Sequence, residues 1–285
     1  MTTFNIGFVI FPNLTQLDFT GPLEVLHRLP ECKIHIVAKS LDPVSSDCGL
    51  SLLPTTTFKD CCQLDLICVP GGGGVVGIMT DRETVDFVRK QAAGARYITS
   101  VCTGAFVLGV AGLRKGRRAT THWAYTGLLE LVGATFEKAR IVKDGNVVTA
   151  GGVASGIDFA LHIATEIAGE ETAQAIQLSI EYDPAPPFTS GHPDRAPASV
   201  TALVAPRYTK RREAYRAVLQ PEDRTPLLGK LSWIVLQYFK RGARSHGKHR
   251  SPDRIRRWPC SGVAYIEHPC FRAAGCRGLC RSEAA

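Results

Sequence analysis

Cys102 is the residue of this chain whose surroundings are best suited to chemistry. It follows the apolar run Tyr97–Val101 and precedes Thr103 and Gly104, so an extended segment turns abruptly into an apolar, helix-forming one. Small residues suit such a turn, because the backbone doubles back with little room for side chains. The amides and dipole of the following helix favour a thiolate, the reactive form of cysteine. The pattern predicts a nucleophile, with a buried structural thiol as the alternative.

Two other segments could complete a site around this thiol. Residues 71–74 are four glycines directly after an apolar run, where backbone amides can approach a ligand and stabilise negative charge. They lack the Lys-Ser/Thr of a phosphate-binding loop, and a flexible connection is the alternative. Asp18 lies between the first apolar run and the first predicted helix. Its carboxylate could hold a proton or orient a water, and it could equally cap the helix.

His122 is a weaker candidate, 20 residues after Cys102. Cysteine–histidine pairs are a recurring nucleophilic arrangement, but spacing along the chain does not establish contact. The other cysteines before Cys102 lack a strand-to-helix turn of this kind and are interpreted as reduced structural thiols, whereas the four beyond residue 225 are interpreted as unstructured thiols. Those near the C-terminus have no paired CxxC spacing, so we expect no zinc site there and no metal elsewhere. These other cysteines are Cys32, Cys48, Cys61, Cys62, Cys68, Cys260, Cys270, Cys276 and Cys280.

Alternating short apolar and longer amphipathic runs predict the elements that position these residues. Strands are expected at 6–11, 34–38, 64–69 and 97–101, with a hairpin turning at Asp144-Gly145. Helices are expected at 19–29 (opened by Gly21-Pro22), 82–92 (capped by Asp81), 104–113, 123–131, 157–167 and 171–181. This alternation favours an α/β fold with a mostly parallel sheet covered by helices on both faces. Ligands of such folds bind outside the carboxyl ends of the strands, where the glycine run and Cys102 both lie.

Composition and charge narrow the classes of protein. Hydrophobic residues make up 45% of the 285 residues and charged residues 21%, which is globular and excludes disordered or coiled-coil chains. The net charge of +8 is unevenly placed. Residues 226–285 hold 12 Lys/Arg and 3 Asp/Glu, whereas residues 1–225 hold 22 and 23. Because the compact part is neutral, the basicity is weak support for a nucleic-acid partner. With no apolar run long enough for a membrane and no basic leader, we expect a cytoplasmic protein.

Several stretches resemble the ThiJ/PfpI superfamily. They are LDFTGPLEVL, VPGGGG and SVCTGAFVLGVAGLRKGRRATTHW, followed by VTAGGVASGIDFALHIATEIAGEETAQAIQLSIEYDPAPPF, which is similar to the isonitrile hydratases within that superfamily. The resemblance covers residues 4 to about 200. It implies a flavodoxin-like three-layer sandwich of the class I glutamine amidotransferase-like type. Domain boundaries follow from it: a domain at 1–205, its extension at 206–225, and a basic tail at 226–285 that no family member resembles.

The resemblance also implies roles for individual residues. Cys102 matches the nucleophile, Asp18 the essential acidic residue and Thr103 a neighbouring residue that is also required. Gly71, Gly72, Gly73 and His122 match positions that line the substrate pocket. The implied reaction adds water to an isonitrile through a covalent thioimidate, giving an N-substituted formamide without metal or organic cofactor. A small-molecule substrate and a homodimer are implied as well.

Two other functions stay open from the sequence. AraC-type regulators carry a similar domain as a sensing module, but they need a helix-turn-helix pair after about residue 200, which this proline- and arginine-rich sequence does not suggest. A glyoxalase- or deglycase-type cysteine enzyme is the third hypothesis. Those branches commonly carry glutamate where this chain has Asp18, which counts against them.

Overall fold

A seven-stranded sheet forms the centre of the computed structural model, which describes residues 3–220. The strand order is β10-β11-β7-β6-β1-β2-β5. The strands are β1 (Phe4–Val9), β2 (Cys32–Ala38), β5 (Thr56–Thr57), β6 (Leu66–Val69), β7 (Tyr97–Val101), β10 (Ile141–Asp144) and β11 (Val147–Ala150). Neighbouring strands are parallel except β10 and β11, which form the predicted antiparallel hairpin. Two-residue strands pair outside this sheet, β3 (Val44–Ser45) with β4 (Ser51–Leu52) and β8 (Arg118–Ala119) with β9 (Thr135–Phe136).

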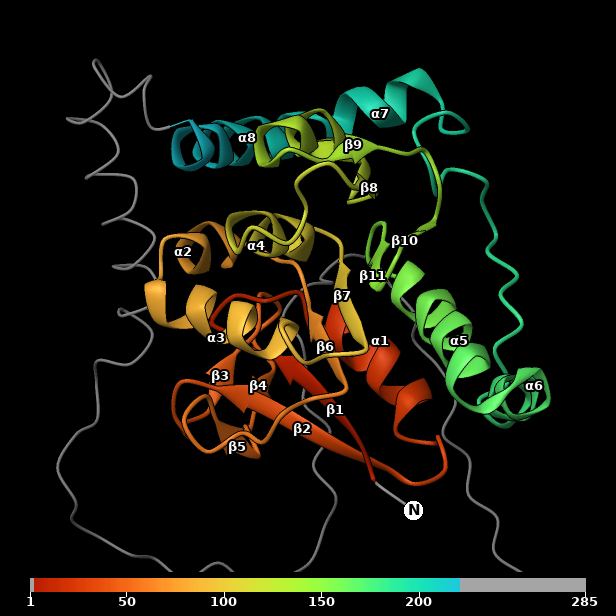
Figure 1. Ribbon diagram of the computed structural model, residues 1–285. Coiled ribbons are helices and arrows are strands. Elements are labelled where there is room, and N and C mark those ends of the chain that lie inside the picture. Colours follow the sequence, from red (N-terminus) through yellow and green to blue (C-terminus); the bar gives the residue numbers. More distant parts are fainter. Residues whose placement is uncertain (1–2, 221–285) are drawn as a thin grey trace, which may run out of the picture. The chain divides into compact units, whose positions relative to one another are not determined.

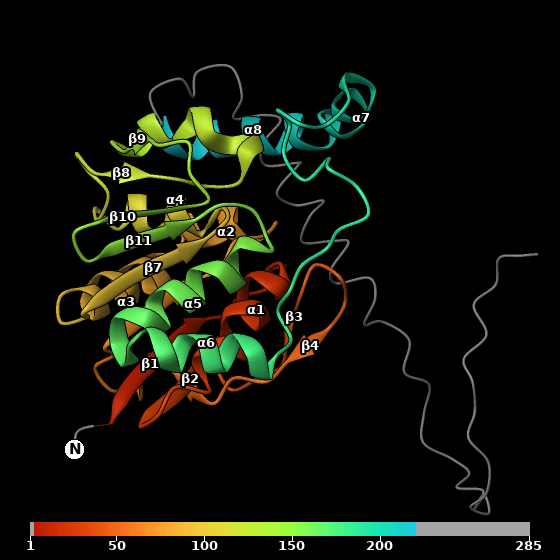
Figure 2. The same cartoon turned by 90° about the vertical axis from the view of Figure 1, so that its right-hand side faces the viewer.

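Helices cover both faces of the sheet, as the alternating pattern predicts (Figures 1 and 2). On one face lie α1 (Gln16–Leu26), α5 (Ser155–Ala168) and α6 (Glu170–Ser179). On the other lie α2 (Val75–Met79), α3 (Arg82–Ala92) and α4 (Gly104–Val110). A 3₁₀ helix, η1 (Trp123–Val132), and the two last helices, α7 (Ala198–Val204) and α8 (Pro206–Leu219), complete the described residues, with α8 packed against η1 and α2.

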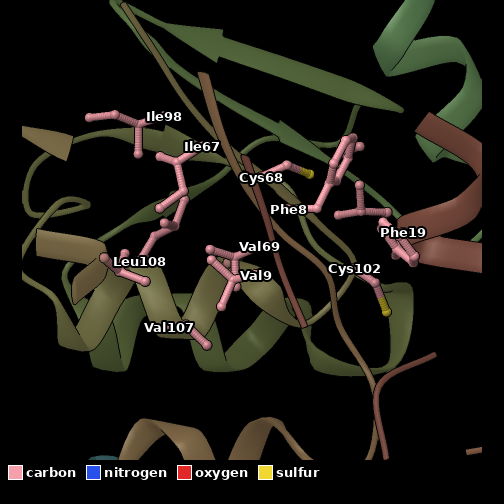
Figure 3. Close-up of a cluster of buried hydrophobic side chains, with 14 of the residues drawn as sticks. Phe8, Val9, Phe19, Ile67, Cys68, Val69, Ile98, Cys102, Val107 and Leu108 are labelled. Carbon is pink, nitrogen blue, oxygen red and sulfur yellow. The ribbon is translucent and has the colours of Figure 1, made fainter. Parts of the chain in front are cut away.

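The core consists of apolar side chains on both faces of the central strands. Successive residues of a strand point to opposite faces, and Phe8 and Val9 of β1 are both fully buried. Phe8 meets Phe19 of α1 edge-on at 5.3 Å between ring centroids, whereas Val9 lies with Val69 near α4 (Figure 3). Central strands of this kind are buried on both faces, which explains why they read as continuous apolar runs. Cys102 lies at one edge of this cluster.

Most predicted elements are present, with shifts of a few residues at their ends, but the start of α1 is different. It begins at Gln16, so Pro22 lies inside the helix rather than at its opening. Proline cannot supply the amide that would bond the Asp18 carbonyl. Its ring instead packs against α5, where a Cβ on Gly156 would lie only 3.0 Å from the Pro22 Cδ. Packing between α1 and α5 therefore outweighs the local preference.

The helices α7 and α8 lie in a segment where the sequence suggested none. Both are rich in β-branched or charged residues and carry little amphipathic signal. Tyr215 is the buried anchor of α8, with its ring 5.0 Å from those of Phe106 and Tyr125. A few aromatic contacts therefore hold α8 on the domain. The predicted tail, 226–285, and the end of the predicted extension, 221–225, lie outside the described residues.

Candidate active site

Cys102 occupies a sharp turn between β7 and α4, as the spacing of small residues predicts. Its φ is +57°, in the left-handed region that non-glycine residues rarely adopt. Two carbonyls, of Ala150 and Gly151, accept hydrogen bonds from its amide at 3.1 and 2.8 Å, and the Thr121 hydroxyl donates to its carbonyl at 2.7 Å. The surrounding structure thus holds a strained residue in place, which is a recurring feature of active sites.

Asp18 lies against this cysteine, as predicted, in the first turn of α1. The carboxyl is fully buried, and its Oδ2 accepts a hydrogen bond from the Gly71 amide at 2.9 Å. It also interacts with the Cys102 thiol. A Cβ on Gly71 would lie 2.6 Å from the Thr103 nitrogen and 2.8 Å from both Asp18 Oδ2 and Cys102 Cβ. Only glycine therefore fits at position 71.

Thr103 and Gly72 form the next part of the site. The Thr103 Oγ1 accepts a hydrogen bond from the Gly72 amide at 3.1 Å, which leaves its own hydroxyl proton free to donate. Gly72 has a φ of +131°, a conformation that side chains disfavour. This hydrogen bond directly joins the turn at residues 102–103 (the elbow) to residues 71–74 (the glycine loop).

The glycine loop is also bound to the segment between β1 and α1. The Thr15 amide donates to the Gly71 carbonyl and the Gly74 amide donates to the Asn13 carbonyl, each at 3.0 Å. Leu14 and Gly72 form an isolated antiparallel bridge between these two hydrogen bonds. The two loops are therefore one backbone unit, which fixes the glycine amides relative to Asp18.

Burial controls the protonation of the Cys102–Asp18 pair. It raises the pKa of Asp18 to about 7, against the opposing effect of the Gly71 amide and the thiol. Burial, followed by the nearby Asp18 charge, also raises the pKa of Cys102 well above its ordinary value, although the Thr103 amide acts in the other direction. The expectation of a resting thiolate is therefore wrong. Above pH 7 the pair holds one proton, on sulfur, beside a carboxylate able to accept it.

Gly73 and His122 are the other two residues predicted to line the pocket, and that role stays a prediction. A Cβ on Gly73 would meet only the Asn13 carbonyl oxygen, at 3.8 Å, so position 73 is open. The ring of His122 packs among those of Trp123, Tyr125 and Tyr208, and its Nδ1 accepts the Ala124 amide at 3.2 Å. Burial, with the Arg211 charge, lowers the pKa of His122 to about 4. A neutral capping histidine within an aromatic cluster is thus what the structure describes.

Tyr215 of α8 lies beside the elbow, and the sequence analysis missed it. Its side chain is 2% exposed, and its hydroxyl makes no hydrogen bond of acceptable geometry. Burial raises the pKa of Tyr215 well above its ordinary value, while the nearby Thr103 side chain acts to lower it. Tyr208 and Tyr215 are seven residues apart, a spacing that places both on the same face of a helix. That spacing was the available signal.

Neither a metal site nor a membrane-spanning helix is found within residues 3–220. No group of three or more His, Cys, Asp or Glu side chains there is arranged to hold a metal ion. None of the helices in that range is both long and apolar enough to cross a membrane.

Comparison with known proteins identifies the family. The DJ-1/PfpI family matches residues 5–166, more than half of the chain. The chain belongs to the DJ-1/PfpI family. Its fold is accordingly the flavodoxin-like fold of that family, as the resemblance to ThiJ/PfpI proteins implied.

Individual relatives refine this placement within the DJ-1/PfpI family. The chain is 60% identical to an isonitrile hydratase of Pseudomonas putida over 195 residues, which are 68% of this chain and 86% of the relative. A crystal structure of a ThiJ/PfpI family protein from Pseudomonas syringae superimposes with a TM-score of 0.75 at 40% identity, covering 77% of this chain and 92% of that one. The transcriptional regulator GbdR of Pseudomonas aeruginosa is 27% identical over 63% of this chain, which spans only 51% of the regulator.

Proposed function

We propose that this DJ-1/PfpI protein is an isonitrile hydratase, which converts an isonitrile and water into an N-substituted formamide. The observation that carries the proposal is the Asp18 carboxyl group buried against the strained Cys102. The 60% identity to the Pseudomonas putida isonitrile hydratase supports this choice of reaction. Cys102, Asp18 and Thr103 are the proposed catalytic residues. Gly71 and Gly72 border the proposed pocket, where their amides hold the Asp18 carboxyl and the Thr103 hydroxyl in place.

In the first step the Cys102 sulfur bonds to the terminal carbon of the isonitrile. The thiol proton passes to the Asp18 carboxylate and from there to the same carbon, so that the product is the thioimidate R–N=CH–S–Cys102. A carboxylate with a pKa of about 7 suits this transfer, because it accepts and releases a proton near neutral pH. The Cys102 thiol stays neutral until it reacts and loses its proton only as the S–C bond forms. The buried site therefore never holds a free thiolate.

In the second step water adds to the thioimidate carbon. Asp18 takes a proton from the water and passes it to the nitrogen, which gives R–NH–CH(OH)–S–Cys102 and restores the carboxylate. Breaking the C–S bond releases R–NH–CHO, and the hydroxyl proton restores the thiol. Covalent catalysis of this kind divides one difficult hydration into two easier additions, and a positioned base contributes about 10²–10⁴ in rate.

Purified protein supplied with cyclohexyl isocyanide tests the proposal. We expect N-cyclohexylformamide, detected by chromatography, and loss of nearly all activity in Cys102→Ala and Asp18→Asn. Mass spectrometry of quenched reactions should show the thioimidate adduct on wild type and not on Cys102→Ala. Methylglyoxal serves as the comparison substrate. Lactate formation without formamide would instead support the glyoxalase-type alternative.

We also propose that the protein is a homodimer. Leu178 at the end of α6 is 81% exposed and Phe188 beyond it is 78% exposed, and a partner subunit seated on this segment would cover both side chains. Light scattering should give twice the chain mass of 30.9 kDa. Leu178→Asp should shift the mass toward the monomer, and a monomeric wild type would contradict the proposal.

A cytoplasmic location completes the proposed function. The six cysteines within residues 3–220 are all free thiols, and thiols persist in reducing compartments. Fractionation of cells that express the tagged chain should recover it with cytoplasmic markers, and recovery from the membrane or medium would contradict this location.

A further inference from the structure

Tyr215 is a buried hydrogen-bond donor that the proposed mechanism leaves unused. Its hydroxyl is enclosed by protein but has no partner of acceptable geometry within the described residues. Buried polar groups are nearly always satisfied, so an orphan beside a reactive centre calls for a ligand as its partner. One of its polar neighbours is the side chain of Thr103, the residue that follows Cys102.

Two aromatic rings hold the side chain of Tyr215 in position. The Tyr215 ring packs edge-on against Phe106 of α4, the helix that follows Cys102. It also contacts the ring of Tyr125 of η1 at a tilted angle. One turn earlier on α8, Arg211 hydrogen-bonds to the Tyr125 side chain. Figures 1 and 2 both show α8 running beside η1. The phenol is therefore rigid, and rigidity is what a positioned donor requires.

The hydroxyl proton of Tyr215 has no acceptor of good geometry among the described residues. Thr103 Oγ1 already accepts the Gly72 amide, and the Cys102 amide is bonded to the carbonyls of Ala150 and Gly151. The amide of Cys102 thus cannot stabilise charge on a substrate. Tyr215 interacts with Cys102 as well as with the Thr103 side chain, so its side chain lies beside the reactive sulfur.

We propose that the Tyr215 hydroxyl donates a hydrogen bond to the substrate nitrogen as sulfur adds to the neighbouring carbon. It thereby stabilises the lone pair that the nitrogen gains in that step and the negative charge that develops there as water adds. This inference rests on the proposed isonitrile hydratase function. The phenol keeps its proton throughout, so no additional bond is made or broken. Burial holds its pKa far above the working range, and the donor is therefore present at every pH at which the enzyme works.

Tyr215→Phe removes the hydroxyl alone and is the central variant. We expect kcat for cyclohexyl isocyanide to fall about a hundredfold, as when one oxyanion-hole donor is lost, with KM changed less than threefold. Because the hydroxyl is unsatisfied without substrate, the variant should melt at the same temperature as wild type or above it. A structural role would lower the melting temperature, and that result would overturn the proposal.

Substituted aryl isocyanides separate charge stabilisation from general damage. A 4-nitro group withdraws charge from the nitrogen and reduces the need for the donor, whereas a 4-methoxy group does not. The loss in Tyr215→Phe should thus be several times smaller for 4-nitrophenyl isocyanide than for 4-methoxyphenyl isocyanide. Equal losses on both substrates would contradict donation to the nitrogen.

Tyr97→Phe is the matched control. Tyr97 is also largely buried, but it begins β7, at the end of the strand opposite Cys102, and its hydroxyl interacts with Glu166. Its kcat should stay within twofold of wild type. If wild type itself makes no formamide, the proposed function and this inference fail together. If wild type is active and Tyr215→Phe is equally active, the inference alone fails.

Discussion

The pairing of Cys102 with Asp18 is the part of the site that the residues themselves predict. An elbow of small residues after an apolar run indicated the cysteine, and the shared edge of a parallel sheet indicated that Asp18 would meet it. The protonation state could not be predicted in this way. It depends on how completely the packed domain removes water from both groups, and burial is the largest influence on each pKa.

The pH dependence of activity should report Asp18. Because burial raises the pKa of Asp18 to about 7, the carboxylate that accepts the thiol proton forms only as pH rises through 7. We expect kcat/KM for cyclohexyl isocyanide to increase about tenfold from pH 6 to pH 8, since kcat/KM reports the free enzyme. A profile that is flat across this range, with no acid limb, would show that Asp18 is not the proton acceptor.

Stability should follow the same group with the opposite sign. The folded protein holds the Asp18 proton up to about pH 7, whereas the unfolded chain releases it near 3.8. The favourable contribution of the protonated Asp18 carboxyl to the free energy of unfolding is therefore complete below pH 3.8 and is lost as pH rises through 7. Between pH 5 and pH 8 this amounts to about 3 kcal/mol. In Asp18→Asn that part of the decline should vanish, as measured by urea unfolding at both pH values; an unchanged decline would count against a raised pKa.

Gly71 and Gly73 offer a test of the glycine loop within a few residues. In Gly71→Ala the new methyl would collide with Thr103, Asp18 and Cys102, so we expect activity to fall at least a hundredfold, of the order that a 1 Å displacement causes. Gly73→Ala adds the same methyl where its nearest neighbour lies at 3.8 Å, and should keep activity within a few-fold. Equal effects of the two substitutions in initial-rate assays would contradict the geometry.

At the level of elements, periodicity located the long pieces and failed on the short ones. Two-residue strands such as β5 carry no alternation to detect, and α8 is anchored by a single buried tyrosine rather than an apolar stripe. The prediction began α1 three residues too late because it took Pro22 as the opening of the helix. In the structure Pro22 packs against α5 from inside the helix, against the usual preference of proline for the first turn. In each case the deciding contact comes from another part of the chain.

The turn between α4 and β8 contains a charge that the fold does not satisfy. Arg114 is fully buried, its three guanidinium nitrogens lack hydrogen-bond partners among the described residues, and burial lowers its pKa to about 10. An unpaired buried charge is strongly unfavourable, so Arg114→Met should raise the free energy of unfolding by about 2 kcal/mol. Arg117→Met is the control. It removes a hydrogen bond to the Asp144 carbonyl and should be neutral or slightly destabilising in denaturant titrations.

Over the whole molecule, the family match and the charge distribution divide the chain in different places. The DJ-1/PfpI match ends at residue 166. Tyr215, which lies beyond that match, is buried against the domain. The basic excess lies entirely beyond residue 225. Composition alone predicts a boundary at residue 225, which lies outside the described residues and stays a prediction. The packing of α8 beside Cys102 could be recognised only in the folded structure.

Removing residues 226–285 should therefore leave the enzyme intact. A chain that ends at Thr225 keeps every residue of the proposed site, so we expect kcat and the melting temperature to match those of the full chain. A chain that ends at Ala205 lacks α8 and should lose both activity and several degrees of thermal stability. A large loss on the first truncation would show that the tail contributes to folding or catalysis.

The backbone bridge between Leu14 and Gly72 bears on any effort to redesign this protein for bulkier isonitriles. Since the two loops share hydrogen bonds on either side of that bridge, inserting residues into one would pull Asp18 out of line with the sulfur. Segments 11–15 and 70–74 would have to be exchanged together, as a cassette. Substitutions on α8, which forms no part of that cassette, would change the surroundings of Cys102 without moving Asp18.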